Sequence, residues 1–447
     1  MTGVHAPSRS HTAPGRAAPR WVLRCVVMAL CCVAVLVALV AWLNVRGEDA
    51  LPATAPPVKP SPDQIERGRY LATVGNCAAC HTAPGGVAWA GGRGIETPFG
   101  VVFSSNLTSD AEVGLGRWNA AEFWRAMHHG RSRDGRLLYP AFPYPEYTRV
   151  TREDADAIFA FLQTLAPVHQ AAPAHALRFP FNTQAALAVW RALFFEPASV
   201  AVDTSRPPAW NRGAYLVQGL GHCAACHSPR NAWGATDPAL PLGGGRIPMQ
   251  PWYAPALDRA DEAGLAGWSM HDAVALLRHG VSPQASALGP MAEVVFRSTQ
   301  YLSEPDAQAI VTYLQALPQR PATPSVSPPV APPAAVMARG AKVYEAHCAQ
   351  CHGEQGQGEK GAFPALAGNR AVLMQDPTNV LQVVLQGGYA PATMGNPRPH
   401  GMPPFRQWLS DDEIAAVATY LRNSWGNQAP GVGTIEVYRA RERRAAQ

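Results

Sequence analysis

Three stretches of the sequence share one pattern, and the rest of the chain is best interpreted from them. They are RGRYLATVGNCAACH (Arg67–His81), RGAYLVQGLGHCAACH (Arg212–His227) and RGAKVYEAHCAQCH (Arg339–His352). Each begins with Arg-Gly and ends with two cysteines three residues apart, followed directly by a histidine. A pattern that returns at such intervals predicts tandem copies of one structural unit.

A second shared signal closes each copy. It is TREDADAIFAFLQTL from Thr151, SEPDAQAIVTYLQAL from Ser303 and SDDEIAAVATYLRNS from Ser410. A Ser or Thr, an acid three residues on and apolar positions at helical spacing predict a capped amphipathic helix. Between the two signals we expect a shorter helix, with N-caps at Asn119, Ser269 and Asp376 and C-caps at Gly130, Gly280 and Gly387 or Gly388. No run shows sustained strand alternation, so we expect three mostly helical modules.

The Cys-x-x-Cys-His units carry the chemistry. At the start of a helix, positions i, i+3 and i+4 share a face, so two thiols can bond the two vinyl groups of one haem while the histidine reaches its iron. Zinc usually takes four ligands from two neighbouring pairs, whereas these pairs lie in separate repeats. Thioredoxin-like chemistry needs one pair, a strand-rich fold and no histidine. The sequence therefore predicts three covalently bound haems c, attached at Cys77, Cys80, Cys223, Cys226, Cys348 and Cys351, with iron ligands His81, His227 and His352.

A second axial ligand is expected for each iron, and methionine is the usual choice when the potential is to be raised. Met291 in GPMAEVV and Met402 in HGMPPF are the candidates in modules two and three. The alternatives there are Met249, Met270, Met394 and His400. Module one has Phe142 at the matching place, and phenylalanine cannot bind iron. Its ligand could be Met127 or the neighbouring His128 or His129, or the position could be open. We expect His222 and His347 to face solvent or lie near a haem edge.

Composition excludes other classes of protein. The 37 Lys and Arg against 32 Asp and Glu give a net charge of +5, and much of that excess lies near the two ends of the chain. The body is close to neutral, which excludes a nucleic-acid binder driven by phosphate contacts. Charged residues make up only 15% and hydrophobic residues 47%, so extended disorder is not expected.

An apolar run from Cys25 to Val45 has no charged residue and is long enough to cross a bilayer. Arg9, Arg16, Arg20 and Arg24 precede it, which predicts that the N-terminus lies in the cytoplasm. We expect an uncleaved single-pass anchor in the cell inner membrane, with the haem domains on the periplasmic side. A long cleaved signal peptide is the alternative, and in either case the body is exported.

Proline-rich stretches divide the chain. We expect a cytoplasmic N-terminus (1–20), a transmembrane anchor (21–45), a proline-rich tether (46–62), domain 1 (63–170), an interdomain helix and linker (171–205), domain 2 (206–317), a second proline-rich linker (318–335), domain 3 (336–427) and a tail (428–447). The stretch from Asn182 to Glu196 should form a helix packed between modules one and two. Its Trp190, Phe194 and Phe195 are expected in the interdomain core.

With these motifs, PAFPYPEY (Pro140–Tyr147) and YLRNSWGN (Tyr420–Asn427), the chain resembles the three-haem cytochrome c subunits of bacterial membrane-bound dehydrogenases over about residues 63–427. That family includes partners of alcohol, gluconate and sorbitol dehydrogenases and of molybdenum hydroxylases that oxidise aldehydes, nicotinate or isoquinoline. The resemblance implies an all-α protein with one N-terminal transmembrane helix and three tandem class I cytochrome c domains. It also implies electron relay from a dehydrogenase catalytic subunit, either a molybdenum hydroxylase or a flavin or quinone dehydrogenase, to ubiquinone or a terminal oxidase. Many members have methionine where this chain has Phe142, and the phenylalanine is more like the molybdenum-hydroxylase branch.

Two other functions compete with this one. A multihaem peroxidase would use an open haem in module one, and Phe142 motivates that hypothesis. A haem module of an oxidase complex would differ from the first only in its partners. No nucleotide-binding glycine loop or nucleophile elbow points to a catalytic site of another kind.

Overall fold

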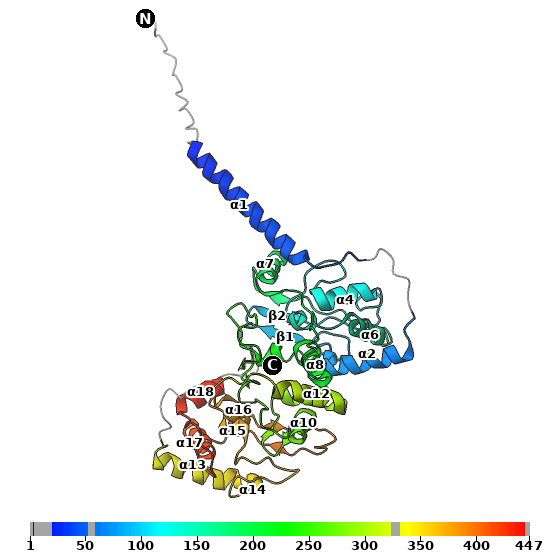
Figure 1. The fold of residues 1–447 in the computed structure, drawn as a ribbon. Coiled ribbons are helices and arrows are strands. Elements are labelled where there is room, and N and C mark those ends of the chain that lie inside the picture. Colours follow the sequence, from blue (N-terminus) through cyan, green and yellow to red (C-terminus); the bar gives the residue numbers. More distant parts are fainter. Residues whose placement is uncertain (1–2, 4–19, 52–58, 323–330, 443–447) are drawn as a thin grey trace.

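The computed structural model describes residues 3, 20–51, 59–322 and 331–442. Helix α1 (Arg20–Val45) projects from a helical body (Figure 1), and it is the only helix among the described residues long and apolar enough to cross a membrane. The arginines at positions 9 and 16 and much of the proline-rich tether lie outside the described residues.

Three long helix pairs form the framework of the body, one in each repeat module. They are α2 (Pro62–Val74) with α6 (Arg152–Leu162), α8 (Pro208–Tyr215) with α12 (Glu304–Gln315), and α13 (Ala334–His347) with α17 (Asp411–Arg422). The Arg-Gly signature explains their close contact. A Cβ atom on Gly68, Gly213 or Gly340 would lie 1.8, 2.0 or 2.3 Å from a backbone oxygen of the facing helix. Only glycine fits where the two helices touch.

The predicted helix ends are largely confirmed. Thr151, Ser303 and Ser410 each accept a hydrogen bond from the backbone amide three residues on, as N-caps do. Asn119 and Ser269 cap α4 (Ala120–His129) and α10 (Met270–His279), which end at the left-handed Gly130 and Gly280. The third helix of this kind, α16 (Thr378–Gln386), begins one residue later than expected. Pro377 is its N-cap, while the Asp376 carboxylate accepts from the amide of Thr378.

Short helices and turns complete the body. They are α3 (Cys77–Cys80), α5 (Tyr144–Tyr147), α7 (Gln184–Phe194), the π-helix η1 (Leu216–Leu220), α9 (Ala224–His227), α11 (Pro290–Arg297), the 3-10 helix η2 (Thr299–Tyr301), α14 (Ala349–His352), α15 (Arg370–Leu373) and α18 (Thr434–Glu442). The stretch expected as a tail contributes α18, whose Val437 and Ala440 are buried in the core of module three.

The mostly helical body also contains short strands, which the sequence did not indicate. One antiparallel sheet joins β1 (Gly94–Thr97), β2 (Gly100–Phe103) and β3 (Ala176–Leu177). Two-residue ribbons pair β4 (Gly245–Arg246) with β5 (Tyr253–Ala254), β6 (Val281–Ser282) with β7 (Ala285–Ser286), and β8 (Gly388–Tyr389) with β9 (Gly401–Met402). Most of these strands have two residues and the longest have four, which is too short to leave a sustained period-2 pattern in the sequence.

The buried hydrophobic side chains of the described residues form two cores rather than three. One core includes residues from modules one and two, among them Leu71, Ile158, Leu216 and Val311. A separate core belongs to module three and includes Leu385, Ile414 and Val437. Modules one and two are therefore packed as one unit.

Helix α7 forms where the sequence predicted it and contacts both modules. Its Gln184 hydrogen-bonds the backbone of Leu137 in module one, and the Trp190 indole donates to the carbonyl of Trp233 in module two. Phe195 is buried against Tyr144, whereas Trp190 and Phe194 are only partly buried. The helix also lies against the end of α1.

Candidate haem-attachment sites

Each Cys-x-x-Cys-His unit lies on a short helical turn. The three turns are α3, α9 and α14, and each follows a longer helix of its module. None of the six cysteines of these units is paired in a disulfide. Burial raises the pKa of Cys77 and Cys223 to about 12 and that of Cys348 to about 11. Redox-active thiols have lowered pKa values, so the thioredoxin-like alternative is not supported.

The motif histidines share one arrangement in all three modules. Nδ1 of His81 lies 2.7 Å from the carbonyl oxygen of Ser105, and Nδ1 of His227 lies 2.7 Å from that of Pro255. In module three, Nδ1 of His352 lies 2.9 Å from the carbonyl oxygen of Pro364. A carbonyl oxygen can only accept, so Nδ1 carries the proton and the Nε2 lone pair is left for a metal.

Burial supports this assignment electrostatically. It lowers the pKa of His81, His227 and His352, against a smaller opposing effect of the backbone carbonyls, and so favours neutral imidazole. Among the described residues, no group of three or more His, Cys, Asp and Glu side chains gathers as a metal cluster. The donor set therefore fits three separate haems better than a zinc site, which would need four protein ligands together.

The candidate distal methionines differ in their surroundings. Met402, in β9, packs against the core of module three, as does Cys348. Met291 lies in the first turn of α11 and is partly buried. The side chain of Met394 is 92% exposed, which sets it apart from Met402 as a ligand. His400, Met249 and Met270 are also exposed.

In module one, the candidate iron ligands on helix α4 have different surroundings. Met127 and Phe123 point from α4 into the core shared by modules one and two. His129 is buried in a different environment, where burial and then the charges of His128, Arg191, Arg131 and Arg125 lower its pKa to about 4. His128 stacks on Trp124, with ring centroids 4.3 Å apart. Phe142 contacts the ring of Tyr147 in the segment that precedes α6.

His222 does not face solvent, contrary to one expectation for it. Its Nε2 lies 3.3 Å from the carbonyl oxygen of Gly75 in module one, and its ring meets that of Tyr147 edge-on. Tyr147 also donates a hydrogen bond to the Gly75 carbonyl. His222 and Gly75 each lie just before an attachment motif, so the two motifs are neighbours across the module boundary. His347 of module three is exposed, as expected.

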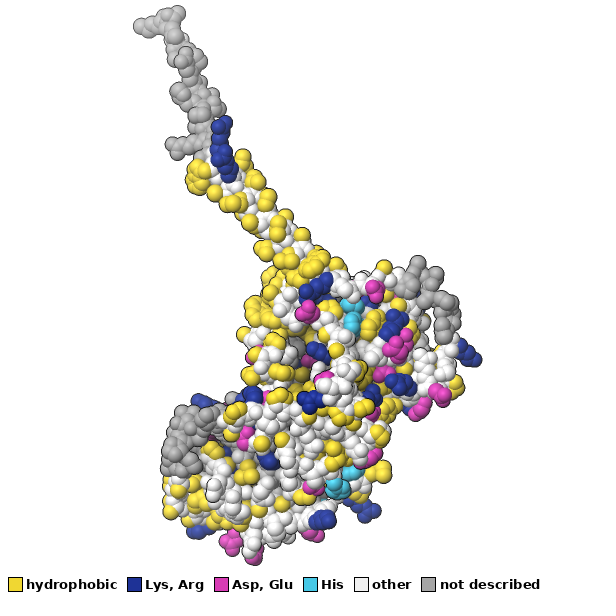
Figure 2. Space-filling view, viewed as in Figure 1, with side chains coloured by type: hydrophobic (Ala, Val, Ile, Leu, Met, Phe, Trp, Pro, Cys, Tyr) yellow, Lys and Arg dark blue, Asp and Glu magenta, His cyan; other side chains and the backbone are white. Residues whose placement is uncertain are grey.

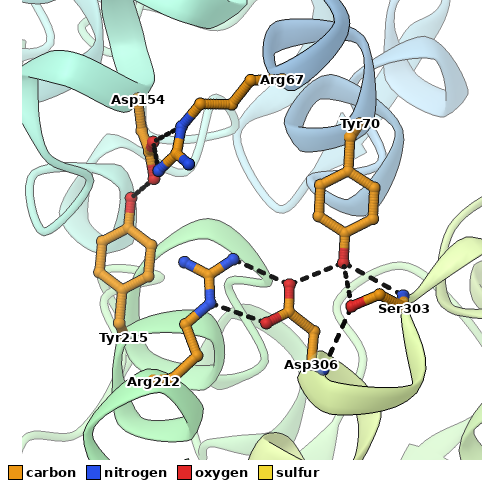
Figure 3. A network of polar contacts seen from close by, with 7 residues as sticks. All are labelled: Arg67, Tyr70, Asp154, Arg212, Tyr215, Ser303 and Asp306. Atoms are coloured by element: carbon orange, nitrogen blue, oxygen red, sulfur yellow. Dashed lines mark hydrogen bonds and ion pairs between the residues drawn. The ribbon is translucent and has the colours of Figure 1, made fainter. Parts of the chain in front are cut away.

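A reciprocal network of polar contacts joins modules one and two (Figure 3). Asp154 accepts from Arg67 of its own module and from the hydroxyl of Tyr215 of module two, at 2.8 and 2.6 Å. Asp306 accepts from Arg212 of its own module at 2.8 Å and from the hydroxyl of Tyr70 of module one at 2.6 Å. Each module thus supplies a tyrosine to the ion pair of the other.

A second reciprocal arrangement lies at the attachment turns themselves. Arg93 donates to the carbonyl of Ala79, inside the first motif, and pairs with Glu293 of module two at 3.0 Å. Arg230 donates to the carbonyl of Ala225, inside the second motif, and lies within electrostatic range of Glu146 of module one.

Neither reciprocal arrangement was predicted from the sequence. One signal for the first of them is present in the repeat, because a tyrosine follows Arg67 and Arg212 at the third position and is absent after Arg339. That difference marks modules one and two as partners.

Comparison with known proteins agrees with this geometry. The cytochrome c family model matches residues 65–166 and 337–425. A subunit of the nicotinate dehydrogenase of Pseudomonas putida is 42% identical over 86% of this chain, which spans only 32% of that protein's length. The cytochrome c subunit of a quinone-type alcohol dehydrogenase of Gluconobacter oxydans is 38% identical, over 82% of this chain and 80% of its own. That of gluconate 2-dehydrogenase of Pantoea cypripedii is 36% identical, over 83% and 88%. The chain therefore belongs to the cytochrome c family, with the haem-bearing cytochrome c subunits of dehydrogenases.

Proposed function

We propose that this chain is a membrane-anchored electron-transfer subunit that carries three haems c and relays electrons from a dehydrogenase catalytic subunit to ubiquinone or a terminal oxidase. The observation that carries the proposal is the threefold recurrence of one arrangement, two thiols and a histidine whose Nδ1 is fixed by a loop carbonyl. Relatives that are cytochrome c subunits of dehydrogenases support the partner.

The residue roles follow from the donor chemistry. The three cysteine pairs would form the thioether bonds, His81, His227 and His352 would be axial ligands, and Met291 and Met402 would be the distal ligands of modules two and three. Met127 is the candidate in module one. Bound haem supplies one-electron oxidation and reduction, and the chain supplies attachment, axial ligation and burial.

The catalytic partner is a molybdenum hydroxylase or a flavin or quinone dehydrogenase. Phe142 and the 42% identity to the nicotinate dehydrogenase protein favour the first class. Helix α1 would hold the chain in the cell inner membrane, with Arg20 and Arg24 on the cytoplasmic side and the body in the periplasm.

A second candidate rests on module one. Phe142 at the place of a distal methionine would suit a peroxidase with an open haem. In that case ferric protein should show a high-spin signal in electron paramagnetic resonance and turn over peroxide. Three low-spin haems would eliminate this candidate.

The test is a tagged pull-down of the full chain from detergent-solubilised native membranes. We expect a molybdopterin or flavin dehydrogenase subunit to co-purify, and a pyridine haemochrome assay to give three haems per chain. Recovery of oxidase subunits alone would instead identify a haem module of an oxidase. A haem count of two, with one motif unmodified in the intact mass, would overturn the three-haem assignment.

A further inference from the structure

Helix α7 exposes an unusually apolar surface for a helix on a water-soluble body. Its only charged residue, Arg191, is 3% exposed, whereas its exposed residues are Gln184 in the first turn and then the apolar Ala185, Val189 and Leu193. Val189 and Leu193 are one turn apart and are 48% and 65% exposed. A surface helix normally presents its polar residues to water and buries its apolar stripe.

The buried arginine has a specific role at this place. Its Nε donates to the side-chain oxygen of Asn44, near the end of α1, at 2.9 Å, and the Asn44 amide donates to the carbonyl of Ala188 in α7 at 2.9 Å. Arg131 of module one donates to the Asn44 carbonyl at 2.8 Å and pairs with Glu48 at 2.9 Å. These contacts hold the end of α1 against α7 and module one, so the body is not free to swing at Val45.

The level of α7 relative to a bilayer follows from the length of α1. The uncharged run from Cys25 to Val45 rises about 31 Å as a helix, which matches a hydrocarbon core of about 30 Å. Asn44 is the next-to-last residue of that run and touches α7 directly. The exposed face of α7 therefore lies at the boundary between hydrocarbon and headgroups.

Other exposed apolar side chains extend this surface. Phe179, shortly before α7, is 82% exposed, and Trp233, whose carbonyl accepts from the Trp190 indole, is 56% exposed. Figure 2 shows hydrophobic side chains continuing from α1 onto the body beside its lower end. Aromatic and aliphatic side chains at this depth are typical of segments that lie in a membrane interface.

From this geometry we propose that α7, with Phe179 and Trp233, inserts into the outer-leaflet interface of the membrane that α1 crosses. The inference rests on the proposed anchorage by α1. We assign lipid rather than a second protein to this surface, because the surface is continuous with the helix that would cross the bilayer. The haem-attachment modules would then face the membrane in one fixed orientation.

Photocrosslinking with lipid tests this. The full-length, haem-loaded chain is reconstituted into liposomes whose phospholipid carries a diazirine in its acyl chain, and labelled peptides are identified by mass spectrometry. We expect label on α1 and on the α7 peptide, and loss of the α7 label in Leu193→Gln. The matched control is Ile435 of α18, which is also 65% exposed but lies in module three, away from α1. Its peptide should carry no label, and Ile435→Gln should change nothing.

Each other outcome has one meaning. Label on α1 without label on α7 overturns the inference and leaves the anchorage intact. Equal label on the α7 and α18 peptides shows non-specific lipid contact and overturns it too. Absence of label on α1 contradicts the anchorage itself. Leu193 is exposed, so its substitution should leave the haem spectrum and melting in detergent unchanged, and both are measured to show that loss of label is not loss of fold.

Discussion

Modules one and two share a hydrophobic core, and a tyrosine of each donates a hydrogen bond to an aspartate of the other. Module three, built from the same repeat, has a core of its own. The position three residues after the arginine of Arg-Gly is Tyr70 in module one, Tyr215 in module two and Lys342 in module three. Both tyrosines hydrogen-bond an aspartate of the other module, while Lys342 is exposed and has no such aspartate opposite it among the described contacts. This position of the repeat is thus a tyrosine in the two modules that pack together and a lysine in the module that has its own core.

The acidic residues that contact the arginine of Arg-Gly also differ between the paired modules and module three. Asp154 and Asp306 are buried and accept from arginine and tyrosine. In module three, Arg339 comes only within 4.0 Å of Asp412, and both side chains are more than half exposed. In module three the acid at the matching place, Glu413, accepts from Ser410 instead. The arginine and the acid therefore belong to a junction in the paired modules, whereas in the third module the arginine has only a solvated contact with a neighbouring acid.

The largest effect is expected from the glycine at the helix crossing. Gly213→Ala places a methyl group 2.0 Å from the carbonyl oxygen of Ala309, which should cost about 3 kcal/mol or more. Hydrogen exchange of the full chain should show modules one and two losing protection together. Gly340→Ala should unfold module three alone. If module one kept its protection in Gly213→Ala, modules one and two would not be unfolding as one unit.

Removal of a buried carboxylate should come next. Asp154→Ala leaves Arg67 and the Tyr215 hydroxyl without their acceptor, at a cost of about 3 kcal/mol if the half-exposed arginine is partly resolvated. Urea unfolding followed by circular dichroism would measure it. An unchanged midpoint would show that the network is not part of the junction.

A pH dependence should follow from Glu146. Burial raises its pKa to about 7, with Arg230 and Arg149 opposing, so the folded chain holds a proton that the unfolded chain releases near pH 4.5. Stability should therefore fall as pH rises from about 4.5 to about 7, by roughly 3 kcal/mol, and then level off. Glu146→Gln should remove this slope. A variant with the same pH profile as the parent would exclude Glu146 as its source.

Loss of a single hydroxyl should cost less. Tyr215→Phe keeps the ring but removes the hydrogen bond to Asp154, for about 1.5 kcal/mol. Tyr70→Phe should match it, because Asp306 is contacted in the same way. Thermal melting of both variants checks the symmetry of the network, and a large difference between them would contradict it.

The smallest effect is expected in module three. Arg339→Ala should change the unfolding free energy by less than about 0.5 kcal/mol, since exposed pairs at this separation contribute little. Chemical denaturation with hydrogen exchange on module three would detect a larger change. Such a change would show that the third module also depends on its Arg-acid contact.

Local features were well predicted from the sequence. The helix starts at Thr151, Ser303 and Ser410 were predictable because a cap and its helix lie within four residues of each other. The two-residue strands were not, and α16 begins one residue later than predicted because Pro377, rather than Asp376, occupies the cap position. Met127, His128 and His129 were indistinguishable by order along the chain, and the structure places Met127 and His129 in different environments.

What the sequence by itself determined is the set of Cys-x-x-Cys-His motifs, the repeat, the apolar N-terminal segment and the family, since each depends on residues close together in the chain. Only the tertiary structure decided which modules pair, which carbonyl fixes each histidine and which side of α7 is exposed. Those depend on partners far apart in sequence, such as Tyr215 with Asp154 and Arg191 with Asn44. The sequence around a tyrosine or a buried arginine does not identify its partner, because the two come into contact only when the modules pack around a common core.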